Sequence, residues 1–180
     1  MKTAYLLTIL LGVLLFSCSN QEQPIQMTNQ NPYFDIKGYF KEQMQRLEQK
    51  NNVVIKTVSK NNDRESQRIE INNWENELEL FTASDINKPD WLKSYRIDST
   101  ENQLVYKSND PKLRTKLITI YKGDDGTVER INIINSDENW LYSSEENLDY
   151  IPDSTYRIRK QQAIRFIGEN QYEIIGELSH

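Results

Sequence analysis

The sequence KLRTKLITIYKGDDGTVERINIIN, residues 112–135, decides the fold. Apolar side chains occur on both faces of residues 112–122, a pattern typical of a central strand in a sheet. The Gly-Asp-Asp-Gly tetrad at 123–126 supplies residues that suit a tight turn. The stretch therefore predicts an antiparallel hairpin in which residues 112–122 turn back onto residues 127–135.

Short strand-like segments separated by turn residues flank this hairpin on both sides. Residues 53–60 are expected to form a strand, and the turn at 61–63 leads into a partner strand at 65–71. Residues 136–154 are acidic and rich in turn formers, with a short strand expected around 140–142. The other predicted strands are 91–98, 104–108, 155–160, 163–167 and 172–178.

Residues 32–50 carry apolar side chains every three or four positions, as in an amphipathic helix. We favour a helix that covers the sheet. The alternative is a second membrane contact through aromatic residues, among them Phe34 and Tyr39. Asn51 and Asn52 are expected to end this helix. The periodic positions are Tyr33, Ile36, Phe40, Met44 and Leu47.

A second helix is expected over residues 72–85. Asn72 can cap its N terminus, with Glu75 in the position of a capping box. The helix is expected to end near Asp85. Asn87 can adopt the left-handed conformation at the helix end, and Pro89 cannot continue a helix.

Trp74, Leu78 and Phe81 lie at i, i+4 and i+7 of this helix, so they should form one buried face. Two helices followed by many strands predict an α+β fold. In this fold two N-terminal helices pack on a largely antiparallel, meander-like β-sheet.

The part of the chain expected to fold, residues 32–180, is predicted to be a single domain. The chain of 180 residues is long enough for one hydrophobic core and too short for two ordinary domains. Its formal net charge is -5 and it has no block of basic residues, so nucleic acid is not an expected partner. No stretch after the N-terminal segment approaches the roughly 20 apolar residues of a spanning helix.

The first eighteen residues have the parts of a secretory signal peptide. Lys2 gives a basic start, residues 4–16 are an apolar core, and Ser17 is a small residue before Cys18. The ending Leu-Phe-Ser-Cys resembles the lipobox of bacterial lipoproteins. This resemblance implies that residues 1–17 are removed and that Cys18 carries fatty acyl chains such as palmitate. A conventional signal peptide that leaves a free thiol is the alternative.

Residues 18–31 are predicted to be the lipidated cysteine and a flexible tether. The segment is polar and amide-rich, and it has no periodicity that could build a buried face. Its typical reach is about 20 Å. Ser19 and Asn20 follow Cys18, which by the sorting rule of such lipoproteins implies the periplasmic face of the outer membrane. Display at the cell surface is the alternative.

The sequence has no catalytic signature. His180 is the only histidine and Cys18 the only cysteine, so histidine-based triads and histidine-ligated metal sites are not expected. The glycines form no phosphate-cradling loop, and no cofactor is expected. A carboxylate-based hydrolase needs two acids across a substrate, and nothing in the sequence places two there.

Two acidic clusters contain oxygen ligands of the kind calcium prefers. Asp124 and Asp125 are more simply residues of a hairpin turn, and the second cluster is more simply a solvated loop. Neither has the spacing of a known calcium loop, so no metal site is predicted. The second cluster comprises Asp137, Glu138, Glu145, Glu146, Asp149 and Asp153.

A basic stripe is a candidate site for an anion. Arg157 and Arg159 alternate along a predicted strand, so they share one sheet face, and Arg165 follows. They could bind an anionic lipid or a peptidoglycan fragment. The alternative is the solvent face of an antiparallel sheet.

Residues 74–81, WENELELF, and 85–91, DINKPDW, resemble a segment of small uncharacterised lipoproteins from Gram-negative, gliding-type bacteria. The tail YEIIG at 172–176 is similar to theirs too. The resemblance implies the localisation and a single domain, and it implies no activity or catalytic residue. A partner-recognition loop is a candidate function of Asp85, Asn87, Lys88 and Trp91.

These observations favour a non-enzymatic, membrane-anchored module. We expect it to bind an envelope protein or lipid through a sheet face or through aromatic loops. A carrier or sensor of an apolar ligand, held between the helices and the sheet, is the first alternative. A carboxylate-based hydrolase is the second.

Overall fold

The computed structural model describes residues 32–50 and 53–179, which form one antiparallel sheet and a few short helices. The α+β class is therefore confirmed. The strands are β1 (Val53–Lys60), β2 (Asp63–Glu70), β3 (Tyr95–Ser99), β4 (Gln103–Ser108), β5 (Thr115–Lys122), β6 (Val128–Glu138), β7 (Tyr142–Ile151), β8 (Thr155–Ile164) and β9 (Gly168–Leu178).

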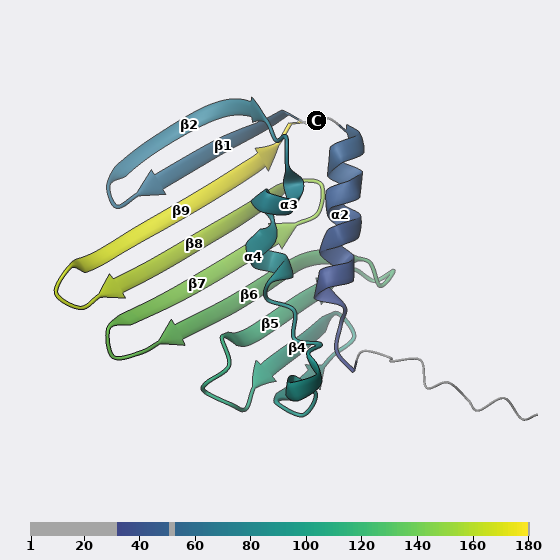
Figure 1. Ribbon diagram of the computed structural model, residues 1–180. Coiled ribbons are helices and arrows are strands. Elements are labelled where there is room, and N and C mark those ends of the chain that lie inside the picture. The colour runs from purple at the N-terminus through teal and green to yellow at the C-terminus, as the bar shows by residue number, and fades with distance from the viewer. Residues whose placement is uncertain (1–31, 51–52, 180) are drawn as a thin grey trace, which may run out of the picture. The chain divides into compact units, whose positions relative to one another are not determined.

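These nine strands lie in the spatial order β2-β1-β9-β8-β7-β6-β5-β4-β3 (Figure 1). From β3 to β9 each strand pairs with the next along the chain, so this part is a meander. β1 departs from sequence order because it pairs with β9, with Thr57 opposite Ile175. The β1–β2 hairpin therefore extends the sheet beyond β9, the last strand of the chain.

The hairpin predicted from residues 112–135 is confirmed. β5 pairs antiparallel with β6, and Ile118 lies opposite Ile133. Gly126 in the connecting turn has φ +81°, a left-handed conformation that glycine adopts without steric cost. The structure starts the first strand three residues later than predicted and extends the second to Glu138.

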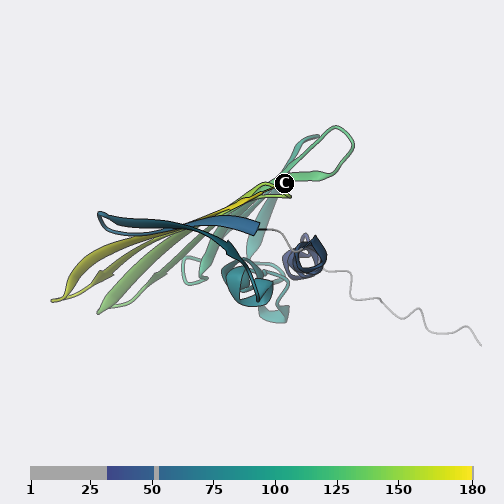
Figure 2. The same cartoon turned by 90° about the horizontal axis from the view of Figure 1, so that it is seen from above.

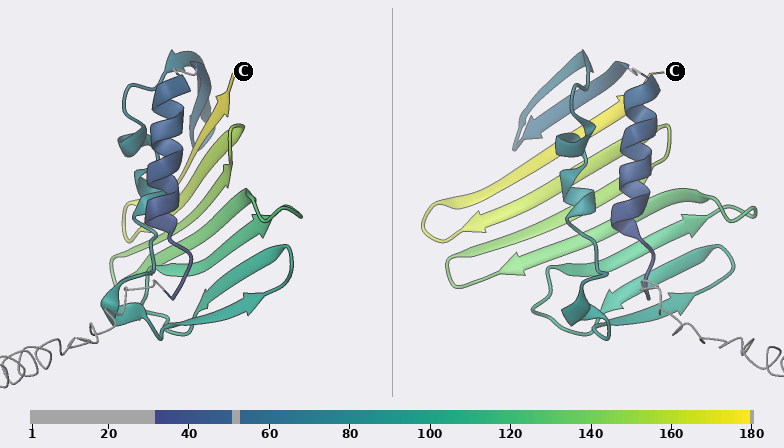
Figure 3. Two further views of the ribbon diagram at one scale, coloured as in Figure 1. Left: turned by 90° about the vertical axis from the view of Figure 1, so that its right-hand side faces the viewer. Right: turned by 45° about the vertical axis from the view of Figure 1, so that its right-hand side comes forward.

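The helices α2 (Ile36–Lys50), α3 (Trp74–Glu77) and α4 (Glu79–Thr82) all lie against one face of the sheet. Figures 2 and 3 show this arrangement, with the strands continuing beyond the helices at one end. The face under the helices is named the covered face, and the opposite one the open face. A short 3-10 helix, η1 (Pro89–Trp91), precedes β3.

Alternation along the strands supplies the core on the covered face. In β7, Leu148 and Tyr150 are fully buried under the helices. Phe40 of α2 and Phe81 of α4 pack on Tyr150, with ring centroids 5.0 and 6.0 Å from its ring. The predicted core helix is present, but it begins at Ile36 and not at residue 32. The alternative membrane contact through its aromatic residues is not supported, because Phe40 and Tyr33 are buried.

Tyr156 in β8 attaches α3 to the sheet. A Cβ at Gly176 would lie 2.1 Å from the Tyr156 ring, so only glycine lets that ring lie against β9. The Tyr156 hydroxyl donates to Glu77 Oε1 at 2.6 Å, and its ring meets Trp74 edge-on at 6.1 Å. Burial, together with the Glu77 carboxylate, raises the pKa of Tyr156 well above its usual range.

The helix expected over residues 72–85 is instead the two four-residue helices α3 and α4. The predicted cap and capping box are wrong. Asn73 caps α3, and its side chain accepts a hydrogen bond from Asn76 N at 2.9 Å. Two adjacent asparagines have the same capping chemistry, so sequence alone could not choose between Asn72 and Asn73.

The buried face predicted for this segment is present despite the break. Trp74, Leu78 and Phe81 are 2%, 0% and 0% exposed. The chain departs from helical geometry at Leu78, which has φ −105° and ψ 15°. The three side chains still reach the sheet, because each short helix keeps its apolar position on the inner side.

Residues 136–154 contain the largest error of prediction. They hold the end of β6 and the whole of β7, a ten-residue strand in the middle of the sheet. Trp140 lies in the turn between them and not in a strand. β7 escaped prediction because two of its core-facing residues, Ser144 and Glu146, are polar.

Two strand boundaries also differ from expectation. The strand predicted over residues 91–98 begins at Tyr95, because Trp91 belongs to η1. The strands predicted at 155–160 and 163–167 are one continuous strand, β8, which ends at Ile164. Residues 165–167 form the turn that leads into β9.

Residues 1–31, 51, 52 and 180 lie outside the described residues. The signal peptide at 1–17, the anchor at Cys18, the tether, the helix stop at Asn51 and Asn52, and the role of His180 therefore stay predictions. Among the helices that are described, none has the length and apolar character needed to cross a bilayer.

Candidate functional site

A hollow of about 540 Å³ lies on the open face. Its walls include side chains of β2 and β7, which are four strand spacings apart, or about 19 Å in a flat sheet. The hollow therefore reaches across the region from β2 to β7 in the strand order. This hollow is named the open-face groove. Its strand-borne lining includes Ser59, Arg64, Glu145, Asn147, Arg159 and Glu173.

Strand register brings the groove together from distant parts of the chain. Arg159 of β8 lies opposite Asn147 of β7 and opposite Glu173 of β9. Two residues further along β8, Gln161 lies opposite Glu145. All of these positions have the same parity in their strands, so their side chains point to the open face.

The β1–β2 turn forms one wall of the groove. Asn61 N donates to the Gln171 carbonyl at 2.8 Å, and Gln171 N donates to Asn61 Oδ1 at 2.9 Å. Asn61 Nδ2 also donates to Asn170 Oδ1 at 3.3 Å. Asn61 has φ +53°, a conformation that asparagine tolerates better than most residues. The wall is therefore tied to β9 by backbone as well as side-chain hydrogen bonds.

The two arginines predicted as an anion site share the open face, but an acid lies beside both. Glu173 Oε1 is 3.2 Å from Arg159 Nε and 3.7 Å from Arg157 Nε. Arg159 lines the groove and its side chain is 51% exposed. Arg157 lies opposite Asp149, outside the groove lining. Of the predicted pair, only Arg159 is positioned to contact a ligand in the groove.

The groove has the chemistry of a polar binding surface. Amide side chains such as Asn147 and Gln161 both donate and accept hydrogen bonds, and Arg159 adds a charged donor. Glu145 adds a carboxylate acceptor. A ligand rich in hydroxyl, amide and carboxylate groups would find a partner for each of these groups here.

The groove also places two acids on one surface, which the sequence could not do. Glu145 is carried by β7 and Glu173 by β9, with β8 between them, so their strands are about 9.5 Å apart. Glu173 is held by Arg157 and Arg159. The arrangement does not present two unpaired carboxylates facing each other, so it gives the hydrolase alternative no specific support.

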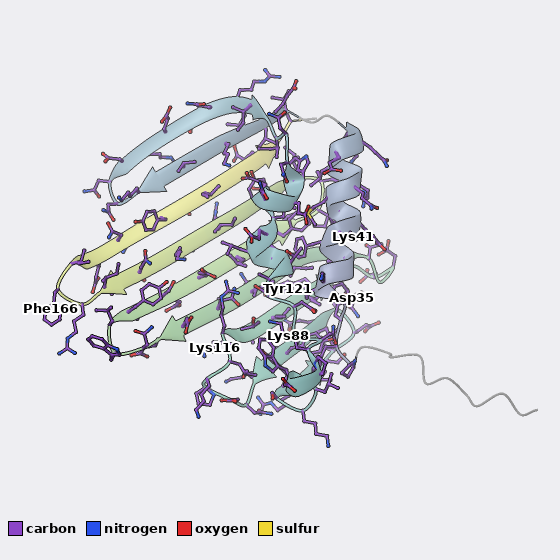
Figure 4. All side chains as sticks on the ribbon, in the orientation of Figure 1. Asp35, Lys41, Lys88, Lys116, Tyr121 and Phe166 are labelled. Carbon is purple, nitrogen blue, oxygen red and sulfur yellow. The ribbon has the colours of Figure 1, made fainter. Side chains whose placement is uncertain are left out.

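The residues proposed for a recognition loop divide between two roles. Asp85 and Lys88 line a second groove, of about 640 Å³, in the helix layer. Lys88 Nζ also lies 3.9 Å from the centroid of the Trp91 ring, a cation–π contact. Figure 4 shows Lys88 in front of the sheet, on the side that carries the helices.

Asn87 has a structural role that its sequence context did not reveal. Its side-chain amide donates to the carbonyls of Tyr33 and Phe34 at 3.3 and 3.1 Å. Its Oδ1 accepts from Tyr33 N at 3.2 Å. Asn87 is not among the described residues with positive φ, so the predicted left-handed helix stop is wrong. Its side chain instead holds the segment that leads into α2.

A buried charged cluster lies on the covered face beyond α4. Glu146 is 5% exposed, forms a short ion pair with Arg114 Nη2, and lies 3.1 Å from Lys160 Nζ. Asn135 Nδ2 donates to Glu146 at 3.3 Å and to Ser84 Oγ at 2.9 Å. These partners satisfy the carboxylate, which explains how an acid occupies a central strand of the sheet.

Within residues 32–50 and 53–179, no group of three or more acids, histidines or cysteines is close enough to hold a metal ion. The two acidic clusters of the sequence are used otherwise. Asp125 Oδ1 accepts from Thr127 N and Oγ1 at 2.9 and 2.6 Å, and these bonds lower its pKa. Asp153 pairs with Lys50 and Arg46 at 2.7 and 2.8 Å, which lowers its pKa.

The groove residues that sequence reasoning missed are polar ones in β7, β8 and β9 and in the β1–β2 turn. Asn147, Gln161 and Asn61 belong to segments that read separately as solvent-exposed polar residues. Only the strand order, with β1 beside β9, brings them to one surface. The one signal in the sequence that could have indicated this polar surface was a polar residue at every second position of consecutive strands.

Comparison of the chain with family models, with curated proteins and with solved structures found no match.

Proposed function

We propose that this protein is an outer-membrane lipoprotein, anchored through Cys18, that binds an envelope glycan through the open-face groove and performs no catalysis. The ligand class is a polar polymer with amide and carboxylate groups, such as peptidoglycan. The observation that carries the proposal is the groove itself, a hollow of about 540 Å³ lined by amides and charged side chains.

The membrane anchor is supported by the sequence alone. The apolar run at 4–16 is followed by Ser17 and Cys18, and the tail of the motif resembles a lipobox. Ser19 and Asn20 support the periplasmic face of the outer membrane, and cell-surface display stays the alternative. A domain tethered there would hold its groove within reach of the periplasmic peptidoglycan.

The choice of a glycan follows from the groove's surroundings. Anion binding alone would favour unpaired cations, yet Glu173 lies beside both Arg157 and Arg159. A neutral to weakly charged ligand with many hydrogen-bonding groups does not require an excess of positive charge. Mixed charges beside several amides match such a ligand better than they match a lipid phosphate.

The alternative of an apolar-ligand carrier has less support. Aromatic rings occupy the space between α2 and the sheet, with Phe40 and Phe81 at 4.8 Å between centroids and both in contact with Tyr150. Phe40 and Phe81 are fully buried by protein atoms. The described residues thus provide a filled core at the place where the carrier alternative requires a dry ligand cavity.

The groove is tested by co-sedimentation of the purified chain with isolated peptidoglycan sacculi. Arg159→Glu places a like charge beside Glu173 and removes a charged donor, so we expect affinity to fall about 10- to 100-fold. Because the Arg159 side chain is 51% exposed, the variant should fold normally. Far-ultraviolet circular dichroism and thermal melting verify this.

Arg96→Glu is the matched control, because it makes the same charge change at an exposed residue of β3, outside the groove. It should leave sedimentation unchanged. The glycan proposal fails if the parent chain does not sediment with sacculi, or if both variants bind as the parent does.

The anchor has its own test in the native host. Cys18→Ala should move the protein from the membrane fraction to the soluble envelope fraction. Retention of the variant in the membrane fraction would contradict anchoring through Cys18 and would leave the groove proposal untouched.

A further inference from the structure

Two neighbouring hairpin turns carry the three most exposed large apolar side chains of the described residues, Phe166, Trp140 and Ile167, together with the partly exposed Leu141. Trp140 and Leu141 lie in the β6–β7 turn, and Phe166 and Ile167 lie in the β8–β9 turn. Their exposed fractions are 76%, 40%, 88% and 76%. In Figure 4 Phe166 lies at the far end of the sheet, away from Asp35 and α2.

The two turns are joined to each other. Arg165 N donates to the Leu141 carbonyl at 2.9 Å, and Tyr142 lies opposite Ile164 in the ladder between β7 and β8. The two turns therefore lie side by side at one end of the strands, and their four exposed or partly exposed apolar side chains are named the apolar tip. The guanidinium of Arg165 lies 5.2 Å from the Phe166 ring centroid.

Phe166 has a backbone conformation that is unfavourable for a residue with an aromatic side chain. Its φ is +72°, in the left-handed region that glycine, asparagine and aspartate occupy most easily. The other described non-glycine residues with positive φ are Asn61 and Asp153, as expected from this preference. A bulky aromatic held there, and 88% exposed, gains no burial that would offset the strain. The exposed and strained position therefore favours a role for the Phe166 ring in binding rather than in stabilising the fold.

The extent of the tip argues for a bilayer over a protein partner. The four side chains together expose about 400 to 700 Å², taking roughly 150–250 Å² for a large side chain. A stable protein–protein interface needs about 800 Å² from each partner, as a continuous surface. A bilayer interface accepts projecting side chains one by one, and tryptophan is enriched there.

Charge near the tip points to neutral lipid. Asp137, Glu138 and Glu169 occupy the strand ends beside the turns, and within residues 136–143 and 163–170 the one cationic residue is Arg165. An acidic surrounding would be repelled by anionic head groups. The attraction must then come from apolar burial.

We propose that the apolar tip inserts into the interfacial region of a lipid bilayer of zwitterionic composition. Trp140 and Phe166 are its principal contacts. The inference depends neither on the open-face groove nor on acylation of Cys18. Together with an N-terminal anchor, such a contact would hold the sheet at a defined orientation to the membrane.

The test measures partitioning onto phosphatidylcholine vesicles. The described fold lies wholly within residues 32–179, so we use the chain from residue 18 onward with Cys18→Ser, which removes any acyl contribution. The double variant Trp140→Ser/Phe166→Ser should lower the partition coefficient at least tenfold. Leu92→Ser/Ile97→Ser, at residues 45% and 49% exposed in and near β3, is the matched control and should bind as the parent does.

Tryptophan fluorescence identifies the contact itself. Brominated phosphatidylcholine should quench part of the emission of the parent chain, and Trp140→Phe should abolish that quenching. Trp74 is 2% exposed and should not be quenched. Binding should change little between low and high salt.

Three results would overturn the proposal. They are absence of vesicle binding by the parent chain, equal binding by the double variant, and binding only to anionic vesicles with loss at high salt. Sedimentation velocity provides a separate check. A dimer that becomes a monomer in the double variant, without vesicle binding, would assign the tip to a second copy of the chain instead.

Discussion

The covered and open faces of the sheet are built by the same strands, yet they differ in almost every property. In β8, Ile158 faces the helices and is 7% exposed, whereas its neighbour Arg159 faces the groove with a 51% exposed side chain. In β7, Tyr150 is buried under α2 and Asp149 lies on the other side. Alternation alone separates these two environments by a single residue.

This difference separates stability from recognition. Fully buried aromatic and aliphatic side chains supply most of the stability of a small domain. Exposed ion pairs such as Arg159 with Glu173 contribute little to stability, about 0 to 1 kcal/mol. Substitutions on the covered face should therefore damage the fold, while those on the open face should leave the fold intact and change binding.

The largest expected effect contrasts one substitution at two places. Ile131 in β6 is fully buried on the covered face, and Ile55 in β1 is 42% exposed on the open face. Ile131→Ala should lower the free energy of unfolding by about 2 to 5 kcal/mol, because it leaves a cavity under the helices. Ile55→Ala should lower it by about 1 kcal/mol or less. Urea unfolding followed by tryptophan emission measures both.

Equal losses from the two isoleucine variants would contradict the division between faces. A loss below about 1 kcal/mol for Ile131→Ala would indicate that the helices do not pack on β6 as the structure describes.

The second prediction concerns alkaline pH and is confined to the covered side. Burial raises the pKa of five tyrosines, Tyr39 to about 12 and the others in the same direction. The unfolded chain ionises these groups near pH 10. Their protonated forms therefore stabilise the fold fully below pH 10, and this stabilisation is lost as pH rises through 10 and 12. The other four are Tyr95, Tyr106, Tyr150 and Tyr156.

Urea midpoints between pH 8 and 12 test this prediction, with tyrosinate absorbance recorded alongside. Tyr150→Phe should make the alkaline loss shallower by about one proton. It also removes the hydrogen bond to Gln43 Oε1 at 3.3 Å, so it lowers stability at neutral pH. Constant stability up to pH 12 would mean that these rings are accessible to solvent.

The smallest expected effect has the opposite sign. Phe166→Gly should raise the free energy of unfolding by about 0.5 to 1 kcal/mol, because glycine adopts φ +72° without strain and this gain exceeds its extra entropy cost. Phe166→Ala is the matched control, since it removes the ring and keeps the strained conformation. Thermal melting should distinguish the two, and both should weaken vesicle binding.

The local pattern of apolar spacing and turn residues correctly predicted elements that have one apolar face or that are bounded by clear turn residues. The hairpin over residues 112–135 has a turn with two glycines and a continuous apolar strand, so it was predicted correctly. The strand at 53–60 was also predicted with its observed bounds. The apolar face of Trp74, Leu78 and Phe81 depends only on spacing, and it is buried as expected.

The same reasoning failed where a partner far along the chain decides the outcome. Glu146 makes β7 read as a solvated loop, and only its contacts with Arg114 and Lys160 allow it to be buried. The sequence around Asn87 predicts a helix stop. Only the proximity of Tyr33 and Phe34 in the fold lets the Asn87 side chain form hydrogen bonds with their backbone. A polar residue predicts solvent exposure, and this prediction fails where a residue far along the chain forms a hydrogen bond or an ion pair with it.

The sequence by itself determined the α+β class and the central hairpin. These depend on local spacing and turn chemistry, which each segment carries without its neighbours. Only the tertiary structure decided that β1 lies beside β9, that Arg159 shares a groove with Asn147, and that the turns carrying Trp140 and Phe166 are neighbours. The reason is physical: strand order and register are set by burial of the whole covered face, and no segment contains that information alone.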